Sequence, residues 1–173
     1  MNYHKIEECS ISNGIGIRTV LWISGCDHHC KGCHNPETWD YKSGKLFDES
    51  AKQELFNNLS KPYIYGITYS GGDPLHWANY SDIISLAKEI REHFPDKTQW
   101  LYTGYDFEYL TQYNDGRDEI FDYIDIMVDG RYIERQRDLT LSFRGSANQR
   151  IIDINKSKAI GLSKAVLWGD DNE

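Results

Sequence analysis

The chain has 173 residues, of which 39% are hydrophobic and 27% charged, and a formal net charge of −8. This length and composition predict one globular domain that buries a core without disulfides. The negative charge argues against a general binder of nucleic acid or of membrane surfaces, because both need a positive field. No apolar run approaches the roughly 20 residues that cross a bilayer. Met1 to Cys9 lack the order of a signal peptide, so we expect a cytoplasmic protein with reduced thiols.

Apolar, β-branched stretches alternate with amphipathic ones along the chain. The first, Ile17–Ile23, predicts a buried strand that ends at Gly25. Asp48–Leu59 predicts a helix with Asp48 as its N-cap. Between Ser81 and Phe94 apolar residues recur at helical spacing, and Pro95 ends that helix. The other predicted elements are strands at Tyr63–Tyr69, Thr98–Thr103 and Tyr123–Val128, and a short helix at Asp106–Tyr113.

The alternation of strands and helices predicts an α/β fold, a parallel sheet with helices outside. About five strands are visible, too few for a closed barrel of eight, so an open partial (β/α) barrel is expected. Leu139–Phe143 and Ile151–Ile154 are less regular. We divide the chain into a domain of residues 1–154 and a C-terminal extension of residues 155–173, without a predicted role, whose end from Gly169 to Glu173 is expected to fray.

Four candidate loops each follow a predicted strand directly. They are the cysteine-rich segment after Gly25, the segment Ser70–Leu75, the break at Thr103 and Gly104, and the pair Asp129 and Gly130. In parallel α/β folds ligands bind at the carboxyl ends of the strands, and these ends lie on one side of the sheet. The sequence therefore predicts one shared site built from these four loops.

Three of the four cysteines, Cys26, Cys30 and Cys33, fall within eight residues. A structural zinc site needs a fourth ligand, and the candidates are Cys9, His28, His29 and His34. A thiol–disulfide site needs only Cys30 and Cys33 and leaves Cys26 without a role. An iron–sulfur cluster of four irons, held by three thiolates, keeps one iron open, as a catalytic metal site requires. Spacing alone leaves these alternatives open.

The pattern Cys26-x3-Cys30-x2-Cys33, placed directly after a predicted strand, resembles the cluster motif of the radical S-adenosylmethionine enzymes. The resemblance implies a [4Fe-4S] cluster on these cysteines, with an open iron that chelates the amino and carboxylate groups of S-adenosylmethionine. It implies that one electron from the reduced cluster cleaves a sulfur–carbon bond, giving methionine and a 5′-deoxyadenosyl radical. It also implies that the partial barrel is of the radical S-adenosylmethionine type.

Ser70-Gly71-Gly72-Asp73-Pro74 resembles the glycine-glycine-acid motif of these enzymes, which binds the methionine amino group. A tight turn is the alternative interpretation of this segment. Asp73 stands where glutamate is commoner, and Gly32 stands where an aromatic residue often precedes the last cysteine. The residues implied to bind S-adenosylmethionine are Gly32, Cys33, His34, Gly71, Gly72 and Asp73, and position alone adds Thr103 and Asp129.

Several stretches, in the same order, resemble the activating enzymes of anaerobic ribonucleotide reductases over about residues 1–154. They are Met1–His4, Trp22–Cys26, Ser70–His76, Tyr102–Tyr105, Met127–Gly130 and Phe143–Arg150. The resemblance implies hydrogen abstraction from a glycine near the C-terminus of the anaerobic ribonucleoside-triphosphate reductase large subunit, with Arg144, Asn148 and Gln149 as candidate contacts. It implies a flavodoxin-like electron donor. The alternatives are an activase of pyruvate formate-lyase type and a zinc-binding interaction module. Cys9 is expected to lie outside the site.

Overall fold

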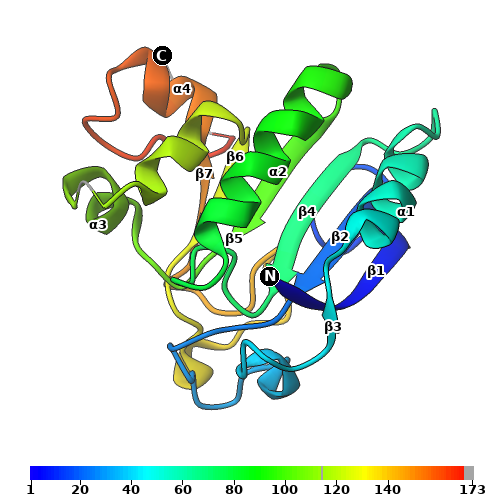
Figure 1. Ribbon diagram of the computed structural model, residues 1–173. Helices are drawn as coiled ribbons and strands as arrows, with labels where there is room; N and C mark the ends of the chain where they lie inside the picture. Colours follow the sequence, from blue (N-terminus) through cyan, green and yellow to red (C-terminus); the bar gives the residue numbers. More distant parts are fainter. Residues whose placement is uncertain (114, 170–173) are drawn as a thin grey trace.

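The computed structural model describes residues 1–113 and 115–169, and within them a seven-stranded sheet has the order β3-β1-β2-β4-β5-β6-β7 (Figure 1). The four middle strands run parallel, and the strands toward both edges run antiparallel. The strands are β1 (Asn2–Ser10), β2 (Arg18–Ile23), β3 (Lys45–Leu46), β4 (Gly66–Gly71), β5 (Thr98–Tyr102), β6 (Ile126–Asp129) and β7 (Arg150–Asp153). The predicted α/β class is confirmed.

The helices follow the predicted order. They are α1 (Glu49–Leu59), α2 (Tyr80–His93), α3 (Phe107–Gln112) and α4 (Ile154–Ala159), with 3-10 turns η1 (Pro36–Thr38), η2 (Arg117–Asp122) and η3 (Glu134–Gln136). The Asp48 side chain accepts a hydrogen bond from the Ala51 N–H at 3.0 Å, which confirms Asp48 as the N-cap of α1. None of these helices is long and apolar enough to cross a membrane.

The expectation of a wholly parallel sheet is wrong at both edges. Strand β1, which the sequence did not predict, pairs antiparallel with β2, and β7 pairs antiparallel with β6. A parallel neighbour needs a crossover of a dozen or more residues, commonly a helix. The link between β1 and β2 is too short for that, and the longer link before β7 holds only the turn η3. The sequence did not predict β1 because this segment, NYHKIEECS, is mostly polar and lacks an apolar, β-branched run.

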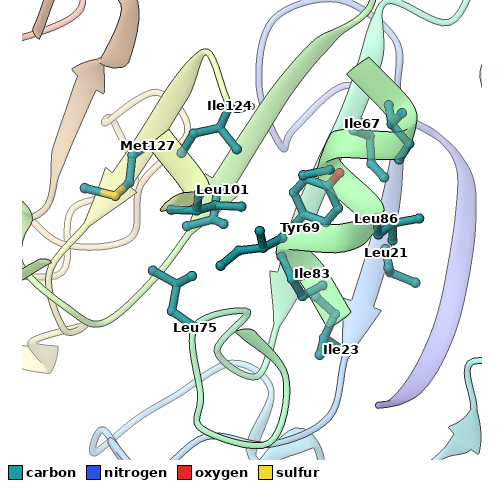
Figure 2. Packing of buried hydrophobic residues seen from close by; sticks show 14 of the residues in the cluster. Leu21, Ile23, Ile67, Tyr69, Leu75, Ile83, Leu86, Leu101, Ile124 and Met127 are labelled. Atoms are coloured by element: carbon teal, nitrogen blue, oxygen red, sulfur yellow. The ribbon is translucent and has the colours of Figure 1, made fainter. Parts of the chain in front are cut away.

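Helices α1 and α2 pack on one face of the sheet (Figure 1). Alternate residues of the central strands belong to one buried cluster with residues of α2, and Figure 2 labels Leu21, Ile23, Ile67, Tyr69, Leu101 and Met127 among them. From α2, Ile83 and Leu86 meet them with at most 4% of their surface exposed. Burial of each such side chain contributes roughly 1.5–3 kcal/mol, so this face supplies most of the core.

The opposite face of the sheet is covered by loops instead of helices. Trp100, Ile126 and Val128 form a second, smaller cluster there, packed against Tyr102, Phe143 and Ile151. Because none of the helices formed by residues 1–113 and 115–169 covers this face, it keeps room for a cavity at the carboxyl ends of the strands.

The described part of the C-terminal extension packs on the sheet. After α4 the chain returns along β7, where the Asp153 N–H donates to the Val166 carbonyl and the Trp168 N–H donates to the Ile151 carbonyl, both at 2.9 Å. The Trp168 ring meets Trp100 edge to face, with 6.3 Å between centroids. The tail therefore covers the second cluster. Of the end expected to fray, residues 170–173 lie outside the described residues.

Trp168→Ala is expected to lower the free energy of unfolding by about 1–2 kcal/mol, because it removes an aromatic pair and uncovers Trp100. Chemical denaturation of the intact chain measures this. The matched control is Leu139→Ala, whose side chain is 80% exposed and whose effect should stay within about 0.5 kcal/mol. Equal stability of the two variants would show that the tail adds nothing to the fold.

Candidate functional site

A cavity of about 560 Å³ lies at the carboxyl ends of the parallel strands, a volume in the range of small-molecule sites. The loops after β2, β4, β5 and β6 all contribute to its wall, so the predicted convergence of four loops is confirmed. The sequence-predicted residues that line it are Cys26, Cys30, Cys33, His34, Gly71, Gly72, Asp73, Thr103, Arg144 and Gln149. Gly32, Asp129 and Asn148 are not among the lining residues.

The cysteine loop is held by backbone hydrogen bonds at its base. The Gly25 N–H donates to the Thr38 carbonyl at 2.7 Å, and the Cys26 N–H donates to the Trp39 carbonyl at 3.0 Å. Further along, the Cys33 N–H closes a turn onto the Cys30 carbonyl at 3.1 Å. All three cysteines are free thiols and are partly buried. The loop therefore presents its sulfur atoms to the cavity on a backbone that is tied to β2 and η1.

Burial changes the acidity of two of these thiols. It raises the pKa of Cys26 to about 12. It also raises the pKa of Cys30, although the Tyr132 backbone opposes the shift and so does the positive charge of Arg131. Both thiols are therefore protonated at neutral pH when no metal is bound. Metal ligation needs thiolates, so loading this site releases protons.

The donor set fits a cluster better than a single metal ion. Within the described residues, no three His, Cys, Asp or Glu side chains are arranged to hold one ion. A closed zinc site needs four ligands directed at one point, whereas each thiolate on a cluster binds its own iron. Two histidines near the thiols have other contacts: His28 lies 2.7 Å from Asp73, and His29 packs against Trp39 with 4.7 Å between ring centroids. Iron–sulfur clusters bind thiolates, and three thiols line this cavity.

Asp73 connects three of the loops around the cavity. Its carboxylate is 2% exposed and lies 2.7 Å from Nε2 of His28, in the cysteine loop. After β5, Thr103 donates its hydroxyl to both carboxylate oxygens, at 2.9 and 3.0 Å, and the Gly104 N–H donates at 2.9 Å. The Leu75 N–H adds a bond at 2.8 Å. Both oxygens are thus occupied by the chain itself, so Asp73 positions the loops.

Sequence reasoning missed the role of His28, which it treated only as a candidate zinc ligand. The ring packs against Gly104, where an added Cβ would lie 2.4 Å from the His28 Cδ2 atom, and it meets Tyr105 edge to face at 4.8 Å. His28 and Asp73 are 45 residues apart, and no local pattern links them. Only the folded chain brings the two side chains together.

Gly71 and Gly72 are needed because backbones approach closely at this point. Gly71 has φ +100°, and a Cβ there would lie 2.7 Å from backbone atoms of Ile23. At Gly72 a Cβ would lie 2.5 Å from the Gly25 carbonyl oxygen. The Gly72 N–H donates to the Ile23 carbonyl and the Asp73 N–H donates to the Gly25 carbonyl, both at 2.7 Å. The two glycines thus join the loop after β4 to the base of the cysteine loop.

Asp129 and Gly32 lie apart from the cavity lining. Asp129 is 1% exposed, accepts the Phe107 N–H at 2.9 Å and pairs with Arg150, so its carboxylate holds the start of α3. Gly32 is exposed, has φ +75° and faces the Glu134 side chain. Neither residue lines the cavity, and their contact with S-adenosylmethionine stays a prediction.

The side chains of Asn148 and Gln149 make bonds within the chain. Asn148 donates to the Arg131 carbonyl at 2.8 Å and accepts from the Ser146 hydroxyl at 2.7 Å. Gln149 donates to the Gly130 carbonyl at 3.1 Å. Arg144, the third candidate contact in this segment, differs from these two residues because its Nε has no hydrogen-bond partner within the described residues.

Fold and site together define an α/β protein with a candidate iron–sulfur centre at the carboxyl edge of its sheet, and comparison with known families agrees. The 4Fe-4S single cluster domain family matches residues 12–152. Curated relatives carry the name anaerobic ribonucleoside-triphosphate reductase-activating protein. The one from Enterobacteria phage T4 is 42% identical over 151 residues, which cover 87% of this chain and 93% of the relative.

Two further relatives of the same name come from bacteria. That of Vibrio cholerae is 40% identical over 153 residues, covering 87% of this chain and 97% of the relative. That of Escherichia coli K12 is 40% identical over 151 residues, covering 86% of this chain and 96% of the relative. The chain belongs to the family of anaerobic ribonucleoside-triphosphate reductase-activating proteins.

Proposed function

We propose that this chain is a radical S-adenosylmethionine enzyme that activates the large subunit of an anaerobic ribonucleoside-triphosphate reductase. One observation carries the proposal: the three clustered thiols and the Gly71–Asp73 segment line the same cavity. The names of the relatives support the choice of partner. When bound at Cys26, Cys30 and Cys33, a [4Fe-4S] cluster supplies the electron that converts S-adenosylmethionine to methionine and the 5′-deoxyadenosyl radical that abstracts hydrogen from a reductase glycine.

The residues of this chain bind and orient the reactants. The three thiolates hold the cluster, and the Asp73 contacts to His28 and Thr103 keep the cysteine loop and the loop after β5 at a constant separation. S-adenosylmethionine occupies the cavity beside the thiols, against Gly71 and Gly72. The open sheet is, in this proposal, a partial barrel of the radical S-adenosylmethionine type, whose loop-covered face admits the partner.

A glycine is a suitable target for this chemistry. Its α-radical is delocalised between the amide nitrogen and the carbonyl, and no side chain blocks the approach of the adenosyl radical. The hydrogen atom moves from the glycine Cα to the 5′ carbon, so the step needs no general base from this chain. The activating chain supplies the position of the reactants, and a flavodoxin-like protein supplies the electron.

The test uses protein purified and reconstituted without oxygen. We expect about four irons and four sulfides per chain, as a single [4Fe-4S] cluster requires, and an electron paramagnetic resonance signal of the reduced protein that changes when S-adenosylmethionine is added. A glycyl radical should then appear on the anaerobic ribonucleotide reductase. Zinc without iron, and no response to S-adenosylmethionine, would overturn the proposal. A radical formed on pyruvate formate-lyase but not on the reductase would overturn the choice of partner.

A further inference from the structure

Positively charged side chains line the cavity beside acidic ones, although the chain as a whole carries a net charge of −8. Three arginines line it, Arg131, Arg137 and Arg144, and none forms an ion pair with a described carboxylate. Each acidic residue of the lining makes at least one hydrogen bond within the chain. Glu7 accepts from the Trp22 indole, Asp73 contacts His28 and Thr103, and Asp138 accepts from Thr140. Within the described residues, the three arginines of the wall therefore keep guanidinium groups that no carboxylate pairs with.

Arg144 is the most confined of the three arginines. Arg131 and Arg137 are exposed, so water satisfies their guanidinium groups. Arg144 is partly buried, and its Nη1 donates to the Gln149 carbonyl at 2.7 Å. Its Nε is buried and has no hydrogen-bond partner within the described residues. An unpaired buried donor is unfavourable, so an acceptor placed beside this nitrogen would be stabilising.

The chain on both sides of Arg144 is held in place. Before it, Phe143 adopts φ +56°, a strained value for a residue with a side chain, and the Tyr102 hydroxyl donates to its carbonyl at 2.7 Å. After it, Oε1 of Gln149 accepts the Gly145 N–H at 3.0 Å and the Ser146 N–H at 3.2 Å. The guanidinium of Arg144 is thus presented to the cavity by a braced turn, as preorganised binding requires.

We propose that Arg144 binds a carboxylate in this cavity through the Nε and Nη2 atoms of its guanidinium group. A planar guanidinium matches the two oxygens of a carboxylate, and such bidentate pairs are among the stronger hydrogen bonds in proteins. The inference rests on the proposed function, because the thiols and Arg144 share one cavity. The carboxylate has two sources there, the methionyl group of S-adenosylmethionine or an acidic group of the reductase.

The experiment compares Arg144→Gln with Arg135→Gln, which removes the same charge from an exposed position that does not line the cavity. Equilibrium binding of S-adenosylmethionine and of its decarboxylated analogue is measured on anaerobically reconstituted protein. If the methionyl carboxylate is the ligand, Arg144→Gln weakens binding of S-adenosylmethionine by about 10- to 100-fold and leaves the analogue unchanged. Arg144→Lys should restore part of the lost affinity, because lysine keeps the positive charge but lacks the planar pair of N–H donors.

A carboxylate from the reductase gives a different result. Affinity for S-adenosylmethionine then stays at the wild-type value, and the KM for the reductase, measured at saturating S-adenosylmethionine, rises about 10-fold or more in Arg144→Gln. If Arg144→Gln matches Arg135→Gln in both measurements, the inference is wrong. Circular dichroism and thermal unfolding confirm that each variant is folded. A wild-type protein that binds no S-adenosylmethionine contradicts the proposed function instead.

Discussion

Replacing any one of Cys26, Cys30 and Cys33 with alanine is expected to abolish reductive cleavage of S-adenosylmethionine, a loss of more than roughly 100-fold. Each thiolate holds a separate iron, so two thiolates leave two irons without a protein ligand. The three thiols line one cavity, and no other cysteine lines it. Cleavage is measured as methionine and 5′-deoxyadenosine formed by freshly reconstituted protein with dithionite as reductant.

Cys9→Ala is the matched control for these substitutions. Cys9 lies exposed on β1 and does not line the cavity. Iron content and cleavage should both stay near the wild-type values. Loss of the cluster in Cys9→Ala would indicate a four-thiolate site with no open iron. Full cleavage by a variant that lacks one of the three clustered cysteines would remove the basis of the proposed function.

Asp73→Asn is expected to lower the free energy of unfolding by about 1–3 kcal/mol and to reduce cleavage of S-adenosylmethionine by about 10- to 100-fold. The amide keeps the shape of the acid but places an NH₂ group where the carboxylate accepts hydrogen bonds. One buried donor, such as the Leu75 or Gly104 N–H, then loses its partner. His28 also loses a charged acceptor, so the cysteine loop is held less firmly.

Two measurements separate these effects. Chemical denaturation reports stability, and cleavage per assembled cluster, at a temperature where both proteins are folded, reports positioning. Asp96→Asn serves as the control, because Asp96 is exposed and does not line the cavity. An Asp73→Asn protein with wild-type stability and cleavage would show that the carboxylate does not tie the loops together. A loss of cleavage with unchanged stability would favour direct contact between Asp73 and S-adenosylmethionine.

In the proposed function, the walls of the cavity limit where the reductase docks. The segment from Arg137 to Arg144 forms one wall and includes the exposed Leu139. Cys26 and Asp73 lie on the wall formed by the strand ends. A glycine that reaches the 5′-deoxyadenosyl radical must enter between these walls. Variants at Leu139, which is exposed on this segment, should therefore alter the KM for the reductase more than the rate of cleavage without it.

Local features of the sequence were sufficient to predict the central strands and the gathering of three cysteines in one loop. Ile17–Ile23 is a short β-branched run, and its chemistry predicts a buried strand without reference to other residues. The spacing of Cys26, Cys30 and Cys33 lies within eight residues, so one loop presents all three. Asp48 caps α1 through an N–H only three residues away. These predictions were confirmed because each depends on residues that lie close together in the sequence.

Only the tertiary structure decided how the polar residues of the site are used. Asp73 meets His28 across 45 residues and Thr103 across 30, so it joins loops that are distant in the sequence. Asp129 pairs with Arg150 and accepts the first N–H of α3. Gln149 accepts the Gly145 N–H and so holds the turn that contains Arg144, whose Nε has no partner within the described residues. A buried polar group takes whichever partner the fold brings within 3 Å or so. The sequence by itself therefore determined which loops meet at the cavity, and the packing of those loops determined which side chains line it and what each contacts.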